Sequence, residues 1–176
     1  MEILAKSTAT AIINCAVEKI NLAEWLFTLK DYEYQSCSEA HIAGGISFSK
    51  EGKRMSINVE KVADNLLVQH YIEEIGKKGH CRVNSLSDSI SALGTTKLSI
   101  TWELNVIALS NNKCEFSNRV IVRATLEFLT LLKSHDITDL SIVKSQMEQN
   151  VMLHNKEETP LFAKNIEGKA IAGIWN

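Results

Sequence analysis

The sequence predicts an α+β fold in which a seven-stranded, curved antiparallel sheet grips a long C-terminal helix, with two short helices after the first strand. β-branched residues dominate the N-terminal segment, residues 40–124 alternate β-like runs with turn residues, and residues 125–176 return to helical spacing. Such a sheet needs a cover for its apolar face, and the long helix is the only element large enough to provide it.

The N-terminal part predicts one strand followed by two short helices. Residues 3–14 are rich in β-branched side chains and contain no breaker. In the next segment, Asn21 with Glu24 three positions later resembles a capping box. The apolar face of this helix is formed by Leu22, Trp25, Leu26 and Leu29. Asp31 is positioned to cap the second short helix.

The central part predicts six strands joined by five short turns. The runs are His41–Ser49, Arg54–Val62, Leu66–Ile75, His80–Ser91, Thr95–Leu109 and Cys114–Ala124. The segments between them are rich in Gly, Asn and Asp, which tolerate the backbone conformations of tight turns. Parallel strands would need crossovers of about a dozen residues, so the pattern predicts an antiparallel meander.

Alternation within these runs predicts which side chains face the core. Leu98, Ile100, Trp102, Leu104 and Val106 alternate with polar residues, as expected of a strand with one dry face. The same reasoning assigns Met55, Ile57 and Val59 to the dry face, and Phe116, Val120 and Val122 on the last strand, where Asn118 interrupts. It places Glu60 and Glu73 on the solvated face.

The C-terminal part predicts three helices. Thr125 caps the first, Leu126–Lys133, and Asp136 opens a long helix that carries an apolar stripe. The stripe is formed by Leu140, Val143, Met147, Val151 and His154. Because proline disfavours helical geometry in the residue before it, Thr159-Pro160 is predicted to end this helix and start another over 161–171. We therefore expect a single domain, 1–176, in which 160–176 form an extra C-terminal helix.

Composition excludes several classes of protein. The 176 residues include 45% hydrophobic and 23% charged residues, and 19 basic and 21 acidic side chains give a formal net charge of −2. The basic residues are scattered, so we expect no nucleic acid partner. No run approaches the roughly 20 apolar residues of a transmembrane span. The four cysteines show no metal-binding spacing, and no secretory signal is recognised, so we expect a cytoplasmic protein with reduced thiols.

The order of elements resembles the START-like superfamily, also called SRPBCC, which includes birch-pollen-allergen proteins, lipid-transfer START domains and polyketide cyclase/dehydrase-like proteins. The segments VEKINLAEWLFTL, HIAGGISFSKEGKRMSINVEKVADNLLVQHYIEEI and GTTKLSITWELNVIAL carry the resemblance, and it is closest to small bacterial members. It implies the helix-grip fold and a cavity for a small hydrophobic molecule between sheet and helix.

Two histidines are candidate site residues. In LLVQHYIEE, alternation places His70 on one face with Leu66, Val68 and Ile72, so we expect His70 and Val68 to point into the core or cavity. His70 would then orient a ligand or move protons, unless it is a hydrogen-bonded core residue. His154 lies on the stripe of the long helix and has the same two interpretations. A pair formed by these two histidines is too few ligands for a metal site, so no metal and no cofactor are expected.

Three further residues are candidates for the cavity wall. Trp102 is predicted to stack on an aromatic ligand or to pack in the core. Phe116 and Met147 are predicted as wall, where methionine would suit a pocket that tolerates different shapes.

The first functional hypothesis is binding of a small hydrophobic or aromatic ligand, lipid-like or polyketide-like. The second is a cyclase or dehydratase in which His70, with Tyr71 or an acid, moves protons. The third is a packed interaction protein without ligand. We also expect a face with Leu161, Phe162 and Ile166 to need covering, which makes a homodimer one alternative.

Overall fold

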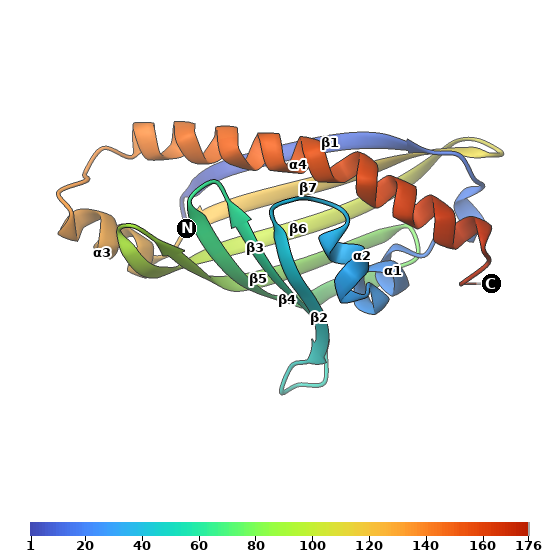
Figure 1. Cartoon of the computed structure of the whole chain (residues 1–176), viewed down its shortest axis with the longest axis horizontal. Helices are drawn as coiled ribbons and strands as arrows, with labels where there is room; N and C mark the ends of the chain where they lie inside the picture. Colours follow the sequence, from blue (N-terminus) through green and yellow to red (C-terminus); the bar gives the residue numbers. More distant parts are fainter. Residues whose placement is uncertain (176) are drawn as a thin grey trace.

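Seven antiparallel strands, two short helices after the first strand and a long C-terminal helix make up the fold in a computed structural model, which describes residues 1–175 (Figure 1). The elements are β1 (Ile3–Ile13), the short 3-10 helix η1 (Val17–Lys19), α1 (Leu22–Thr28), α2 (Asp31–Gln35), β2 (His41–Phe48), β3 (Arg54–Val62), β4 (Asn65–Lys77), β5 (His80–Ser91), β6 (Gly94–Ser110), β7 (Lys113–Ala124), α3 (Leu126–Ser134) and α4 (Leu140–Ile171). The strand order is β1-β7-β6-β5-β4-β3-β2. The predicted fold class is confirmed.

Two of the predicted helix caps are present. The side chain of Asn21 accepts a hydrogen bond from the backbone N–H of Glu24 at 3.1 Å, and Thr125 accepts one from Phe128 at 3.0 Å. The cap of α4 lies three residues later than expected, because Asp136 adopts a φ of 59° outside the helical region and Asp139 caps the helix instead. These caps fix where each helix leaves the sheet.

α4 continues through Pro160, so the predicted break at Thr159 and the separate helix over 161–171 are wrong. Proline removes the hydrogen bond to the carbonyl of Lys156, but both residues are exposed and water can serve as the donor. Thr159 also donates its hydroxyl to the Asn155 carbonyl within the same turn. Figure 1 shows that the orange and red halves of α4 differ in direction, a bend of the kind that proline causes.

The two halves of α4 are buried to different extents. Its fully buried residues all belong to the C-terminal half: Asn155, Glu158, Thr159, Phe162, Ala163, Ile166 and Ala170. Phe162 and Ile166 are 0% exposed in the core. The predicted exposed face of Leu161, Phe162 and Ile166 is therefore wrong, because only Leu161 reaches the surface.

The inner face of the sheet changes character across its width. On β6 the prediction is confirmed, because Leu98, Ile100, Trp102, Leu104 and Val106 are all buried. On β3 it is wrong, because Ser56, Asn58 and Glu60 are the buried residues and Met55, Ile57 and Val59 lie on the outer face. β5 likewise turns Ser85, Ser87 and Ser89 inward. The core is therefore apolar under β6 and β7 and polar toward β3.

Strand register explains where the residues of β4 point. Residues opposite each other on antiparallel strands share a face, and His70 pairs with Ile57 while Val68 pairs with Val59. His70 and Val68 therefore lie on the outer face, which corrects the expectation that they point inward. Leu67, Gln69 and Tyr71 are the buried residues of β4.

The four cysteines are free and buried. Within residues 1–175, none of the helices has the length and apolar character that crossing a bilayer would require.

Candidate functional site

A cavity with two adjoining chambers lies between the sheet and α4. The outer chamber has a volume of about 320 Å³ and the inner one about 60 Å³. They adjoin along a wall shared by Val62, Leu67, Ile100, Val122 and Val151. The cavity exists because the N-terminal half of α4 is only partly buried, so its side chains do not fill the space above the sheet.

The outer chamber is mainly apolar. Its walls include Leu98 of β6, Phe128 and Leu132 of α3, and Met147 and Val151 of α4. Ser89 and Thr96 contribute small polar side chains from β5 and β6. This chamber can therefore enclose an apolar group, with few polar atoms to fix its orientation.

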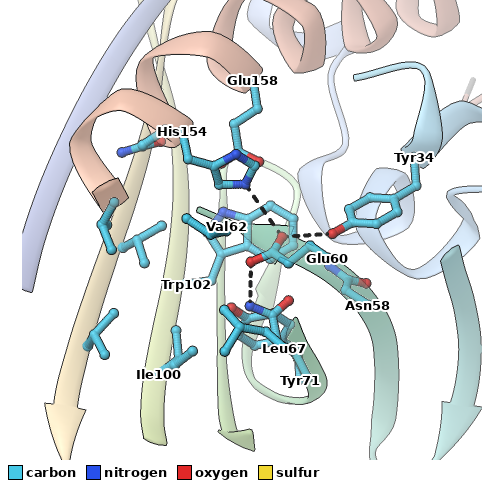
Figure 2. A pocket seen from close by; sticks show the side chains of 15 residues that line it. Tyr34, Asn58, Glu60, Val62, Leu67, Tyr71, Ile100, Trp102, His154 and Glu158 are labelled. Atoms are coloured by element: carbon cyan, nitrogen blue, oxygen red, sulfur yellow. Dashed lines mark hydrogen bonds and ion pairs between the residues drawn. The ribbon is translucent and has the colours of Figure 1, made fainter. Parts of the chain in front are cut away.

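The inner chamber ends at a cluster of ionisable side chains. Figure 2 shows Glu60 of β3, His154 and Glu158 of α4 and Tyr34 of α2 converging above Trp102 and Tyr71. Although polar, these side chains lie inside the protein, where an ionised group needs partners. The exposed fractions of the Glu60 and Glu158 side chains are only 9% and 7%.

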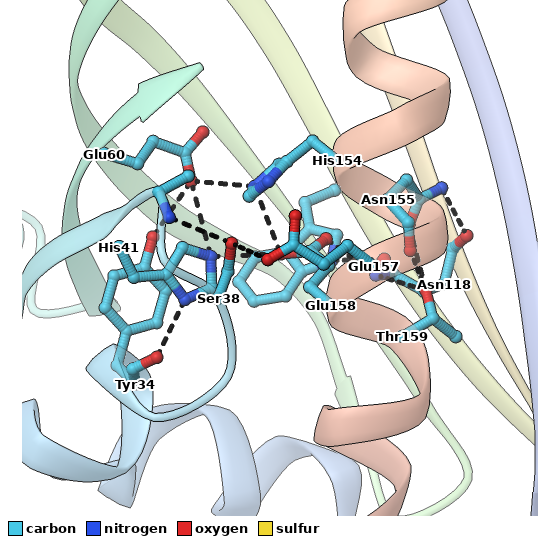
Figure 3. Close-up of polar contacts among 12 residues, drawn as sticks. Tyr34, Ser38, His41, Glu60, Asn118, His154, Asn155, Glu157, Glu158 and Thr159 are labelled. Atoms are coloured by element: carbon cyan, nitrogen blue, oxygen red, sulfur yellow. Dashed lines mark hydrogen bonds and ion pairs between the residues drawn. The ribbon is translucent and has the colours of Figure 1, made fainter. Parts of the chain in front are cut away.

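Two imidazoles and two carboxylates meet at the centre of this cluster, as Figure 3 shows. The Nε2 atom of His41 lies 3.2 Å from Oε2 of Glu158 and 3.8 Å from Oε2 of Glu60. The Nε2 atom of His154 lies 3.4 Å from each of the same two oxygens. Each carboxylate thus turns one oxygen toward both histidines.

The other oxygen of each carboxylate is held by an amide side chain. Gln69 donates to Oε1 of Glu60 at 2.8 Å, and Asn118 donates to Oε1 of Glu158 at 2.9 Å. Tyr34 donates its hydroxyl to Oε2 of Glu60 at 3.0 Å. These bonds orient the carboxylates, and they explain why Asn118 interrupts the apolar alternation of β7.

His41 is held from two sides. Its Nδ1 atom lies 2.7 Å from the backbone carbonyl of Tyr34, which accepts the ring N–H. The ring stacks on that of Tyr34 with centroids 3.9 Å apart and an interplanar angle of 6°. Phe162 lies stacked at 5.9 Å. The Nε2 atom is therefore directed at the two carboxylates.

The pKa values of the cluster reflect this geometry. Burial alone would lower the pKa of His154, but the carboxylates of Glu60 and Glu158 outweigh it and raise that pKa to about 9. Burial alone would raise the pKa of Glu60, yet His154, His41 and the Tyr34 hydroxyl keep it below the usual value. Burial, followed by the two carboxylates, raises the pKa of Tyr34 well above that of a free tyrosine.

The structure brings together three of the six predicted site residues. Trp102 and His154 line the inner chamber and Met147 lines the outer chamber. Trp102 also donates its indole N–H to Asn118 at 2.7 Å. Phe116 is 0% exposed in the hydrophobic core, outside the residues that line the two chambers.

His70 and Val68, on the outer face of β4, are on the opposite side of the sheet from the cavity. Tyr71, considered as a partner of His70, does line the inner chamber.

Sequence reasoning misses most of the polar cluster. Alternation assigns Glu60 to the solvated face, and it does not single out His41, Tyr34, Gln69 or Glu158. One signal is present: His154 and Glu158 are four residues apart, which places them on one helical face. The contribution of His41 depends on a strand that pairs only at the far edge of the sheet, and no local pattern reveals that.

Comparison with known proteins places the fold. No protein-family model matches the sequence, and no curated protein matches it either. Solved structures do match: the Zhui aromatase/cyclase from Streptomyces sp. R1128 aligns with a TM-score of 0.63 and 10% identity, over 93% of this chain and 94% of that one. The fold is a helix-grip fold.

Two further solved structures match over a similar extent. A protein from Thermus thermophilus aligns with a TM-score of 0.53 and 14% identity, covering 95% of this chain and 97% of its own. A conserved protein from Geobacillus kaustophilus aligns with a TM-score of 0.53 and 6% identity, covering 93% and 96%. At such low identity the likeness concerns the helix-grip fold alone.

Proposed function

We propose that this protein binds a small molecule whose apolar body occupies the outer chamber and whose polar group points toward the inner chamber. The observation that carries this proposal is the pair of adjoining chambers, the outer one mainly apolar and the inner one bordered by Glu60, His154 and Glu158. The outer volume of about 320 Å³ is at the small end of the range for ligand pockets, about 300–1,000 Å³. The ligand is therefore smaller than most lipids with two chains.

The polar end narrows the chemistry of the ligand. Buried carboxylates attract hydrogen-bond donors and cations, whereas imidazoles and the amides of Asn58 and Gln69 accept or donate. Trp102 and Tyr71 add aromatic surface beside these groups. A phenolic or hydroxylated aromatic compound combines both requirements better than a plain fatty acid does.

A cyclase-like enzyme is the second candidate, and the Zhui aromatase/cyclase is an example of an enzyme with this fold. What favours it is that two carboxylates and an imidazole border the inner chamber, within reach of a bound molecule. The version in which His70 moves protons loses its support, because His70 lies on the other face of the sheet.

A thermal-shift screen against phenolic aromatics, polyketide-like aromatics, sterols and fatty acids tests the proposal. A ligand that binds only the folded state stabilises it by about 2.7 kcal/mol at a hundredfold excess over Kd. Met147→Trp would fill the outer chamber and should remove the shift. Met152→Trp is the matched control, because Met152 is 49% exposed on the other side of α4. No saturable shift in any class, or equal shifts in both variants, would contradict the proposal.

A further inference from the structure

We propose that His41, His154 and Glu60, with Glu158 beside them, form a binding site for a divalent transition-metal ion at the inner end of the cavity. One ligand atom from each of the first three residues lies within 4.8 Å of the other two. Two imidazoles and one carboxylate are a donor set that binds zinc in catalytic sites and iron in non-haem sites. The three residues come from β2, β3 and α4, so the folded chain assembles the set.

The distances from His154 to the two carboxylates match metal ligands better than hydrogen bonds, whereas His41 makes a hydrogen bond of 3.2 Å to Glu158. The four separations between histidine Nε2 and carboxylate Oε2 atoms are 3.2, 3.4, 3.4 and 3.8 Å. Charge-assisted hydrogen bonds between such groups are shorter, about 2.7–2.9 Å. Ligands about 2.1 Å from a tetrahedral zinc ion lie about 3.4 Å from one another. The ligand atoms of His41, His154 and Glu60 therefore lie close enough to reach one ion with small rotations of their side chains.

One atom of the cluster lacks a partner. The buried Nε2 of His154 makes no hydrogen bond within the described part of the chain, although two carboxylate oxygens face it. Native proteins seldom leave a buried polar atom unpaired. A metal ion beside Nε2 would give this atom a partner, with Oε2 of Glu60 as a neighbouring ligand.

The surroundings supply the outer shell that metal sites require. Metal-binding histidines usually donate their second ring N–H to a carbonyl or carboxylate, and the backbone carbonyl of Tyr34 accepts from Nδ1 of His41. Gln69 and Asn118 bind the carboxylate oxygens that face away from the centre. Oε2 of each carboxylate faces the histidines, and that of Glu60 also accepts a hydrogen bond from Tyr34.

Charge and access also fit a metal ion. When a metal ion displaces the proton that the carboxylates favour on His154, both imidazoles are neutral and the two carboxylates balance the charge of one divalent cation. Nitrogen ligands disfavour Mg²⁺ and Ca²⁺, which prefer oxygen. Glu60, His154 and Glu158 border the inner chamber, so a coordination position would face the cavity, as in catalytic zinc sites.

Metal titration of the full chain tests the site without any organic ligand. Protein treated with a chelator and then dialysed should bind Zn²⁺ with a stoichiometry of one, measured by calorimetry. Co²⁺ should give the visible absorption bands of a low-symmetry nitrogen and oxygen site, and Zn²⁺ should abolish them by displacement. Fe²⁺, added without oxygen, shows whether iron competes. Absence of saturable binding by the wild-type protein would overturn the proposal.

Three variants and one control locate the site. His41→Gln, His154→Gln and Glu60→Gln should each weaken Zn²⁺ binding at least as much as loss of an outer-shell partner does, about 10- to 100-fold. His70→Gln is the matched control, because it removes a histidine from the outer face of β4 and should leave the affinity unchanged. Equal affinities in all four variants would overturn the assignment.

Two further measurements separate the possible failures. Far-UV circular dichroism establishes that each variant folds, and if one does not, the Co²⁺ spectrum of the wild-type protein decides on its own. The proposed site does not depend on the cavity ligand, because the thermal-shift screen can be run with chelator present. A protein that binds an aromatic compound under chelator, but no metal, would refute only the metal site.

Discussion

At the scale of single residues, the site depends on how closely the backbone of β2 approaches Tyr34. A Cβ atom added to Gly44 would lie 3.1 Å from the Cβ and Cδ1 atoms of Tyr34. The Tyr34 ring cannot retreat easily, because it stacks on His41 and donates a hydrogen bond to Glu60. A residue without a side chain is therefore needed at position 44, while the adjacent Gly45 has no described heavy atom within 4 Å of its Cβ position.

This contrast gives a prediction with a built-in control. Gly44→Ala should lower the free energy of unfolding by about 1–3 kcal/mol, the usual cost of overpacking. Gly45→Ala should change it by less than about 0.5 kcal/mol, as surface substitutions do. Urea denaturation of the two variants measures both values. Equal stabilities would mean that Tyr34 can move without disturbing the cluster.

At the scale of elements, α4 combines two structural roles. Its C-terminal half carries all of its fully buried residues, from Asn155 to Ala170. Its N-terminal half covers the outer chamber with the partly buried Val143, Met147 and Val151. One continuous helix thus anchors at one end and covers the cavity at the other.

Hydrogen exchange should distinguish the halves of α4. Backbone amides open more readily where few side chains are buried, so peptides covering 140–152 should exchange faster than those covering 155–170. A cavity ligand should slow exchange mainly in the first segment. Uniform exchange along the helix would show that its N-terminal half is anchored by more than these contacts.

The elements also show why some predictions succeed. The prediction for β6 is correct because its inner face packs on core side chains, and burial then follows the apolar alternation. The prediction for β3 has the faces the wrong way round because its inner face borders a polar cluster, so Ser56, Asn58 and Glu60 find partners inside. Alternation identifies two faces, but only the partner element decides which is inside. The helix does not break at Pro160 because water can replace the hydrogen bond that proline removes. Packing of the following turns outweighs the remaining cost of proline in the helix.

At the scale of the whole molecule, the first strand and the last helix of the chain pack side by side. β1 pairs with β7, and in Figure 1 α4 runs beside β1. Trp25 of α1 contacts Phe162 of α4 with ring centroids 5.1 Å apart, and Trp102 of β6 contacts it at 5.7 Å. Residues far apart in the sequence thus share one core, which is the reason to propose a single domain over 1–176.

One core predicts one unfolding transition. Thermal unfolding followed by tryptophan fluorescence and by far-UV circular dichroism should give the same midpoint, because Trp25 and Trp102 lose their contacts only when the sheet and α4 separate. An earlier fluorescence transition would indicate that the C-terminal part of α4 detaches independently.

The serines on the inner face of β5 bear on how the range of ligands can change during evolution. Ser85, Ser87 and Ser89 occupy positions where a filled sheet would carry larger side chains, and Ser89 borders the outer chamber. Exchanging Ser89 for valine or leucine would remove space from the chamber in small steps and leave strand register untouched. Selection could therefore retune the range of molecules admitted gradually, while the anchored half of the helix and the apolar side of the sheet keep the protein folded.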